Sequence, residues 1–132
     1  MSARASGTFK VGSWDEKAIV EDDDGRKLTR ASIAGAYAGD MEGESTSESV
    51  MCYRPDGTAT FVSMERIEGR LGGRAGSFVL RSTGTYDGSE ARATLSIEAG
   101  SGTGDLEGIA GEGLFRAPKG PEGTFELEYR FE

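Results

Sequence analysis

Glu65 is the residue best placed to do chemistry, because the pattern around it puts a carboxylate on an apolar strand face. Residues 58 to 71 alternate with period two, and the more apolar set is Ala59, Phe61, Ser63, Glu65, Ile67, Gly69 and Leu71. An inward carboxylate is costly to ionise, so we expect Glu65 either to have a raised pKa or to pair with an arginine. It would then act as a general acid or base. The alternative, which we favour, is a rim carboxylate or half of a structural ion pair, since such networks perturb carboxylates without catalysis.

The absence of histidine restricts the available chemistry more than any other single fact. It excludes Ser-His-Asp and Cys-His catalysis, and it removes the commonest transition-metal ligand. Carboxylates, tyrosines, lysines and arginines remain. If the protein is an enzyme with Glu65 as acid or base, Tyr53 or Arg30 would serve as hydrogen-bond donors, and we expect neither a metal nor a cofactor.

Two segments resemble ligand loops but lack the residues that those loops need. Residues 100 to 111 are rich in glycine, yet they contain no Gly-Lys-Ser or Gly-Lys-Thr, and the glycine spacing does not match a dinucleotide fingerprint. We expect a structural turn there, with one short helical step held by Leu106 and Ile109. Residues 22 to 25 read Asp-Asp-Asp-Gly, but Ile33 stands where a calcium loop needs Glu. A solvated acidic turn is expected at that place.

Length and charge limit the fold and the partners. The chain has 132 residues, with 21 glycines, 3 prolines and 36% hydrophobic residues. This length supports one hydrophobic core, so residues 1 to 132 are expected to form a single domain. Glycine suits short strands and tight turns better than helices. The net charge of −8 argues against nucleic acid and an anionic membrane surface as partners.

Cys52 and the first residues bear on the cellular location. Cys52 is the only cysteine, so no intrachain disulfide can form, and we expect its side chain to be small, apolar and buried. Met1 to Arg4 contain no apolar run, and no segment approaches the roughly 18 apolar residues of a spanning helix. We therefore expect a cytoplasmic protein.

Alternation of apolar and polar residues predicts strands, most clearly in the second half of the chain. Hairpin turns are predicted at residues 55 to 57, at Gly72-Gly73 and at Asp87-Gly88. Residues 15 to 26 are predicted to be an acidic loop. The predicted strands are residues 5 to 13, 28 to 38, 42 to 54, 58 to 71, 74 to 86, 90 to 98, 112 to 117 and 124 to 131.

About eight antiparallel strands in one small domain predict an all-β fold with little helix, a single closed eight-stranded β-barrel. A two-sheet sandwich is the main alternative. The interior of such a barrel holds side chains or one small ligand. The residues whose inward parity would place them at a ligand are Phe61, Ser63, Phe78, Leu80, Ser82, Tyr86 and Leu95.

Six segments spread along the chain carry a family resemblance: Ser13 to Lys17, Leu28 to Ser32, Tyr53 to Thr58, Glu65 to Gly69, Gly73 to Phe78 and Ser101 to Leu106. Together they resemble a bacterial family known as a domain of unknown function, number three-two-two-four. That family resembles the eight-stranded barrels of allene oxide cyclase and dirigent proteins, which implies the same fold here. Barrels of that shape hold reactive hydrophobic intermediates for cyclisation or coupling without a bound cofactor. The resemblance also implies a histidine where Ser82 stands, so any activity that needs it would be missing.

These observations leave three functions open. The first is a cofactor-free cyclase or isomerase of a small, hydrophobic, natural-product-like molecule, with Glu65 as acid or base. The second is a barrel that binds a small hydrophobic molecule without catalysis. The third is a lumen packed solid, which would leave a structural role or a homo-oligomer interface. The size of the lumen separates the third from the other two.

Overall fold

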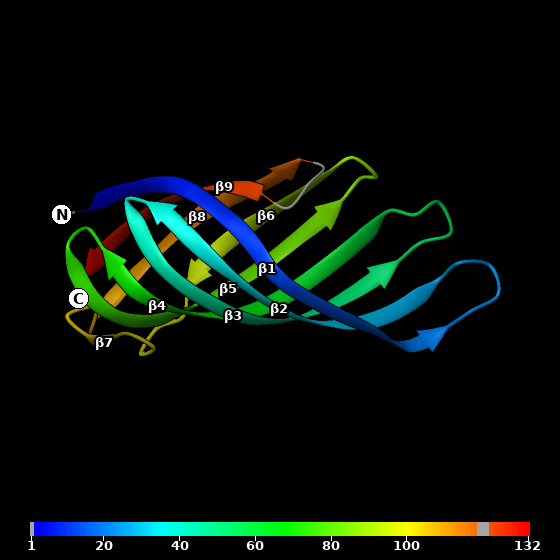
Figure 1. The fold of residues 1–132 in the computed structure, drawn as a ribbon, viewed down its shortest axis with the longest axis horizontal. Helices are drawn as coiled ribbons and strands as arrows, with labels where there is room; N and C mark the ends of the chain where they lie inside the picture. Colours follow the sequence, from blue (N-terminus) through cyan, green and yellow to red (C-terminus); the bar gives the residue numbers. More distant parts are fainter. Residues whose placement is uncertain (1, 119–121) are drawn as a thin grey trace.

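Residues 2–118 and 122–132 of a computed structural model are described, and their strands close into an antiparallel barrel (Figure 1). The strands are β1 (Ala3–Glu21), β2 (Lys27–Gly39), β3 (Met41–Tyr53), β4 (Ala59–Leu71), β5 (Arg74–Tyr86), β6 (Glu90–Ile97), β7 (Thr103–Gly104), β8 (Ile109–Pro118) and β9 (Glu122–Phe131). Within these residues the order is β4-β3-β2-β1-β9-β8-β6-β5, and β5 pairs back to β4. The short β7 pairs only with β5. The predicted closed eight-stranded barrel is confirmed, with one extra strand.

β1 is longer than predicted, because residues 15 to 21 continue the strand instead of forming an acidic loop. They pair with β2 through two register shifts, between Val11 and Ser13 and between Ala18 and Val20. Each shift adds a residue to β1, which bends the strand and changes which side chains face inward. Asp15 and Glu21 are exposed, so their charge does not oppose pairing, whereas Glu16 is half-buried. Figure 1 shows the resulting β1–β2 hairpin extending beyond its neighbour, the β3–β4 hairpin.

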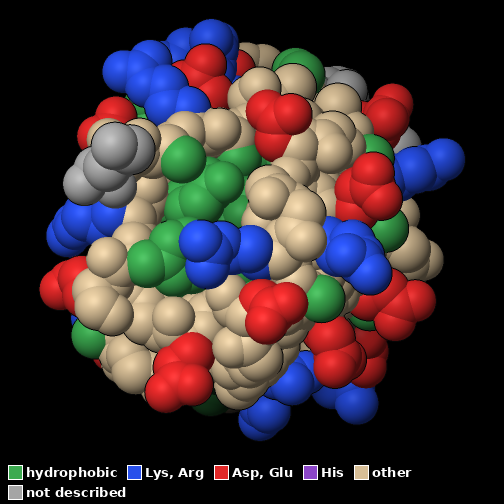
Figure 2. All heavy atoms as spheres, turned by 90° about the vertical axis from the view of Figure 1, so that its left-hand side faces the viewer, with side chains coloured by type: hydrophobic (Ala, Val, Ile, Leu, Met, Phe, Trp, Pro, Cys, Tyr) green, Lys and Arg blue, Asp and Glu red, His purple; other side chains and the backbone are tan. Residues whose placement is uncertain are grey.

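The hydrophobic core fills the half of the barrel nearest the chain termini. The largest fully buried side chains all belong to this half: Met41, Ile67, Leu71, Phe78, Leu80 and Leu106. Figure 2 views this end of the barrel, where charged side chains surround a small hydrophobic area. There the Arg74 guanidinium lies 4.1 Å from the centre of the Phe131 ring, a cation–π contact. This half of the lumen is therefore packed with side chains.

The glycine-rich segment covers the packed half. Leu106 and Ile109 are both buried, as predicted. The segment forms successive turns rather than the predicted helical step, with hydrogen bonds from Leu106 N to Thr103 O and from Ile109 N to Leu106 O. Gly100, Gly102 and Gly104 stand at every second position, and glycine favours turns over a helix. No helix long and apolar enough to cross a membrane occurs in the described part of the chain.

Cys52 is exposed, so the prediction that it is buried is wrong. Side chains of β3 alternate between the two faces of the barrel wall, and Ser49 and Met51 occupy the inward positions. Cys52 must then point outward, as does Val50, which is 40% exposed. The inward face of β3 thus combines serines with methionines, whereas its outward face carries Glu42, Glu44 and Glu48.

Leu71→Ala should lower the free energy of unfolding by about 2–5 kcal/mol, because it leaves a cavity in the packed half. Leu71 is 0% exposed, whereas Leu114 in β8 is 55% exposed. The matched variant Leu114→Ala should therefore change the free energy of unfolding by less than about 0.5 kcal/mol. Urea denaturation followed by circular dichroism measures both. Equal losses from the two variants would contradict the assignment of the packed half.

Candidate functional site

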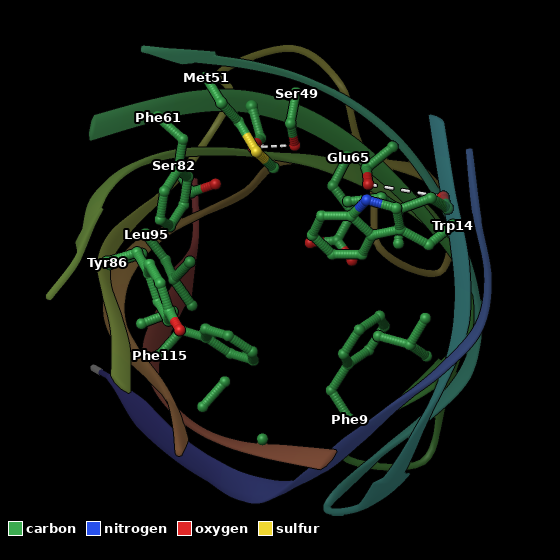
Figure 3. A pocket seen from close by; sticks show the side chains of 18 of the residues that line it. Phe9, Trp14, Ser49, Met51, Phe61, Glu65, Ser82, Tyr86, Leu95 and Phe115 are labelled. Atoms are coloured by element: carbon green, nitrogen blue, oxygen red, sulfur yellow. Dashed lines mark hydrogen bonds between the residues drawn. The ribbon is translucent and has the colours of Figure 1, made fainter. Parts of the chain in front are cut away.

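The other half of the barrel encloses a cavity of about 390 Å³, shown in Figure 3. All eight strands of the ring contribute to its lining. Several lining residues stand at strand ends remote from the termini, among them Tyr53, Tyr86 and Pro118. The cavity therefore opens at the end of the barrel opposite the packed half. The barrel interior is therefore packed solid in one half and open in the other.

Aromatic rings lie against the cavity wall because glycines on neighbouring strands leave room for them. Phe61 in β4 lies over Gly84 in β5, and Phe115 in β8 lies over Gly123 in β9. A Cβ atom at Gly84 would come within 2.5 Å of Phe61 Cζ, and one at Gly123 within 2.6 Å of Phe115 Cζ. Any larger residue at either glycine would push a ring toward the lumen. These glycines thus help to keep the cavity open.

A polar strip of serines runs along the cavity on the strands β3, β4 and β5. Its members are Ser47, Ser49, Ser63 and Ser82. The Ser49 and Ser63 hydroxyl oxygens lie 2.5 Å apart and share a hydrogen bond. In Figure 3, Ser49 and Glu65 lie across the lumen from Phe9 and Phe115. The cavity wall therefore combines a polar strip with aromatic side chains, and one aromatic side, with Phe9 and Phe115, lies opposite Ser49 and Glu65.

Glu65 lies at the boundary between the cavity and the packed half. Its carboxylate accepts hydrogen bonds from the Tyr37 hydroxyl, at 2.9 Å to Oε1 and 2.8 Å to Oε2, and another from the Ser45 hydroxyl. None of the ion pairs among residues 2–118 and 122–132 includes Glu65. Burial raises the pKa of Glu65, although the hydrogen bonds from Ser45 and Tyr37 partly oppose that rise. The sequence predicted that Glu65 has either a raised pKa or an arginine partner. The pKa is raised, and no described arginine forms an ion pair with Glu65.

Tyr37 is a candidate that the sequence-based set of site residues omits. Its side chain is 6% exposed and lines the cavity. Burial, reinforced by the adjacent Glu65 carboxylate, raises the pKa of Tyr37 well above its ordinary value. The phenol therefore keeps its proton and serves as a hydrogen-bond donor to Glu65. The arrangement can hold a proton on Glu65 or present an oriented carboxylate to a bound molecule.

Tyr53 lines the mouth of the cavity and is engaged with Glu16 rather than with Glu65. Its hydroxyl donates to Glu16 Oε2 at 2.7 Å. Burial, followed by this hydrogen bond, raises the pKa of Tyr53 to about 12. Glu16 also accepts hydrogen bonds from Thr29 at 2.6 Å and from Trp14 Nε1 at 3.0 Å. Glu16 thus ties the β1–β2 hairpin to the end of β3.

The predicted positions of three site residues are corrected by the structure. Arg30 lies outside the barrel, with its Nε atom 2.8 Å from Glu48 Oε1, because Thr29 and Ala31 occupy the inward positions of β2. Phe78 and Leu80 do face inward, but each is 1% exposed in the packed half and neither lines the cavity. Their parity indicated the face correctly, but it carries no information about depth along the barrel.

The remaining residues of the predicted ligand site all line the cavity. They are Phe61, Ser63, Ser82, Tyr86 and Leu95. Within the described ranges, no cluster of three or more His, Cys, Asp or Glu side chains is arranged to hold a metal ion. The polar groups on the described lining include Glu65, Tyr37 and the serines.

Comparisons with known proteins identify relatives of the same fold. Residues 5–129 match a family described as "Protein of unknown function (DUF3224)". A similar solved structure is a protein of unknown function from that family in Shewanella oneidensis MR-1. It is 28% identical, with a TM-score of 0.84, over 100% of this chain and 98% of that chain. No curated protein matches the sequence.

The buried Glu65 should make stability depend on pH. An acid whose pKa is higher in the folded state stabilises the fold below its unfolded pKa and loses that contribution as pH rises through the folded pKa. Glu65→Gln keeps the shape and cannot ionise. Its free energy of unfolding, relative to wild type, should therefore rise between about pH 4.5 and pH 7.5. Urea denaturation at both pH values measures the difference.

Glu68→Gln is the matched control, because Glu68 lies on the same strand and its side chain is 71% exposed. Its free energy of unfolding relative to wild type should not follow the trend expected for Glu65→Gln. Parallel pH profiles for wild type and Glu65→Gln would show that Glu65 titrates normally in the folded protein.

Proposed function

We propose that this chain, which belongs to the DUF3224 family of proteins of unknown function, binds a small, largely apolar molecule inside its barrel. The observation that carries the proposal is the cavity of about 390 Å³. Sites for small molecules typically measure about 300–1,000 Å³ and combine apolar walls with a few polar groups. Here Glu65, Tyr37 and the serine strip supply the polar groups.

The cost of an open lumen supports this proposal. Protein interiors are close-packed, and each unfilled volume costs stability. The cavity-facing positions include the small residues Ala59, Ala91, Ala93 and Ala117, whereas the packed half uses Leu, Ile, Met and Phe. Larger apolar residues at these alanines would fill the space. An interior kept open by small side chains is what a ligand site requires.

A neutral fluorescent probe, N-phenyl-1-naphthylamine, tests the proposed binding. The wild-type protein should bind it and increase its fluorescence. Ala91→Phe places a ring inside the mouth, so it should weaken binding by more than about tenfold, a loss of about 1.4 kcal/mol. Thr94→Phe is the matched control, because Thr94 lies on the same strand and is exposed. Equal binding by both variants, or no binding by wild type, would rule out the cavity as the site.

A second candidate function is cofactor-free cyclisation or isomerisation of a natural-product-like molecule. It is favoured by the position of Glu65, a carboxyl group with a raised pKa at the floor of the cavity. Such a group can take a proton from a bound molecule and return it at another atom. The cavity walls would hold the reacting conformation. Tyr37 would orient the carboxylate.

The conversion of 3-cyclohexen-1-one into its conjugated isomer, 2-cyclohexen-1-one, is a small probe for this chemistry. If the proposal is right, the protein accelerates the reaction, and Glu65→Gln slows it by more than about tenfold. Glu68→Gln should keep the wild-type rate. Ultraviolet absorbance of the conjugated product measures the rate. A Glu65→Gln rate equal to wild type would remove Glu65 from the mechanism.

A further inference from the structure

The charge of the cavity points to a class of ligand. Of the described residues that line the cavity, the charged ones are Glu65 and Glu122, both acidic, and neither a lysine nor an arginine is among them. Glu16 adds a third carboxylate at the mouth, where it holds Tyr53. A molecule entering the lumen therefore meets negative charge at the mouth and again at the floor.

None of the lysines and arginines in the described part of the chain forms an ion pair with Glu65. Arginines pair with carboxylates on the outer face, as Arg30 does with Glu48 and Arg116 with Glu90. At the mouth, Lys27 Nζ lies 4.7 Å from the centre of the Tyr53 ring, and its charge acts on Glu16. Among residues 2–118 and 122–132, the hydrogen-bond donors to Glu65 are the neutral hydroxyls of Tyr37 and Ser45. No positively charged side chain among the described lining residues balances the charge of the Glu65 carboxylate.

We infer that the cavity selects small organic cations, namely protonated amines with an apolar body, over neutral or anionic molecules of the same shape. This inference rests on the proposed function, since it names the ligand class of the same cavity. The ammonium group donates charge-assisted hydrogen bonds to Glu65, which are stronger than neutral ones. Phe9 and Phe115, which lie across the lumen from Glu65, offer aromatic surface to the apolar body of the ligand (Figure 3). The apolar body packs toward Phe61 and Leu95.

Anionic and neutral molecules gain less from the same site. An anion must lose water beside Glu65 and finds neither a lysine nor an arginine among the described lining residues. A neutral alcohol fits the serine strip and the aromatic side, but its hydrogen bond to Glu65 lacks one of the two charges. An ammonium group also loses hydration, and its charge-assisted hydrogen bonds to the carboxylate offset that cost.

The preference for cations should depend on pH, because a protonated Glu65 is a weaker partner for an ammonium group. Of the described residues, the titratable groups that line the cavity are Glu65 from β4, Tyr37 from β2 and, at the mouth, Tyr53, Tyr86 and Glu122, with Glu16 beside Tyr53. On β5, the residue opposite Glu65 in the register is Leu80, which does not titrate. Burial raises the pKa of Glu65. Amine affinity should therefore increase as pH rises through that pKa.

Three naphthalene compounds of matched shape test the inference: 1-naphthylmethylamine as cation, 1-naphthalenemethanol as neutral isostere and 1-naphthoic acid as anion. Isothermal titration calorimetry measures their dissociation constants with the full chain. At about pH 7.5, the amine should bind about tenfold more tightly than the alcohol, and the acid more weakly than both. At about pH 5, amine binding should weaken while alcohol binding stays constant.

Two variants test whether Glu65 causes the preference for cations. Glu65→Gln should reduce the amine-to-alcohol ratio to below about threefold while the alcohol still binds. Glu68→Gln removes the same charge from the outer face and should keep the wild-type ratio.

If the alcohol binds wild type as tightly as the amine does, the inference is overturned and the cavity proposal stands. If none of the three compounds binds, both fail. Should Glu65→Gln not fold, the wild-type pH series decides, since amine affinity that does not change with pH overturns the inference.

Discussion

The pairing of β4 with β5 closes the ring, and every property of the lumen depends on that closure. In a closed barrel each strand contributes alternate side chains to one shared interior, so neighbouring strands compete for the same space. The size of those side chains then determines whether each part of the interior is packed or open. Leu71, Phe78 and Leu80 fill one half. Serines, alanines and glycines leave the other half open.

Glu65 stands where the two halves meet, and this position links stability with function. Packed apolar residues such as Ile67 lie on one side of it and the cavity on the other. The fold keeps an acid with a raised pKa without giving it a basic partner. Two neutral donors, Tyr37 and Ser45, hold the carboxylate in place. Functional groups kept at a cost in stability are common in binding and catalytic sites.

The inner face of β3 explains both a success and a failure of prediction. Its inward residues include Ser45, Ser47 and Ser49, while Val50 and Cys52 point outward. Cys52 was expected to be buried because a lone cysteine often behaves as a small apolar residue, and that expectation did not use the parity of β3. Serines at every second position were the one available sign of a polar cavity wall. In β2, small residues occur on both faces, so alternation could not place Arg30 outside.

Local pattern in the sequence determined the strands, most turns, the family, the barrel and the inward parity of Glu65, because alternation and turn residues act over a few neighbours. The tertiary structure alone decided the depth of each inward residue, which separates Phe78 from Phe61. It also decided the extension of β1 and the contact of Tyr37 with Glu65. These depend on the stagger between strands, and Tyr37 and Glu65 lie on β2 and β4, with β3 between them. Register across several strands is set by the whole ring, so no short segment of sequence contains it.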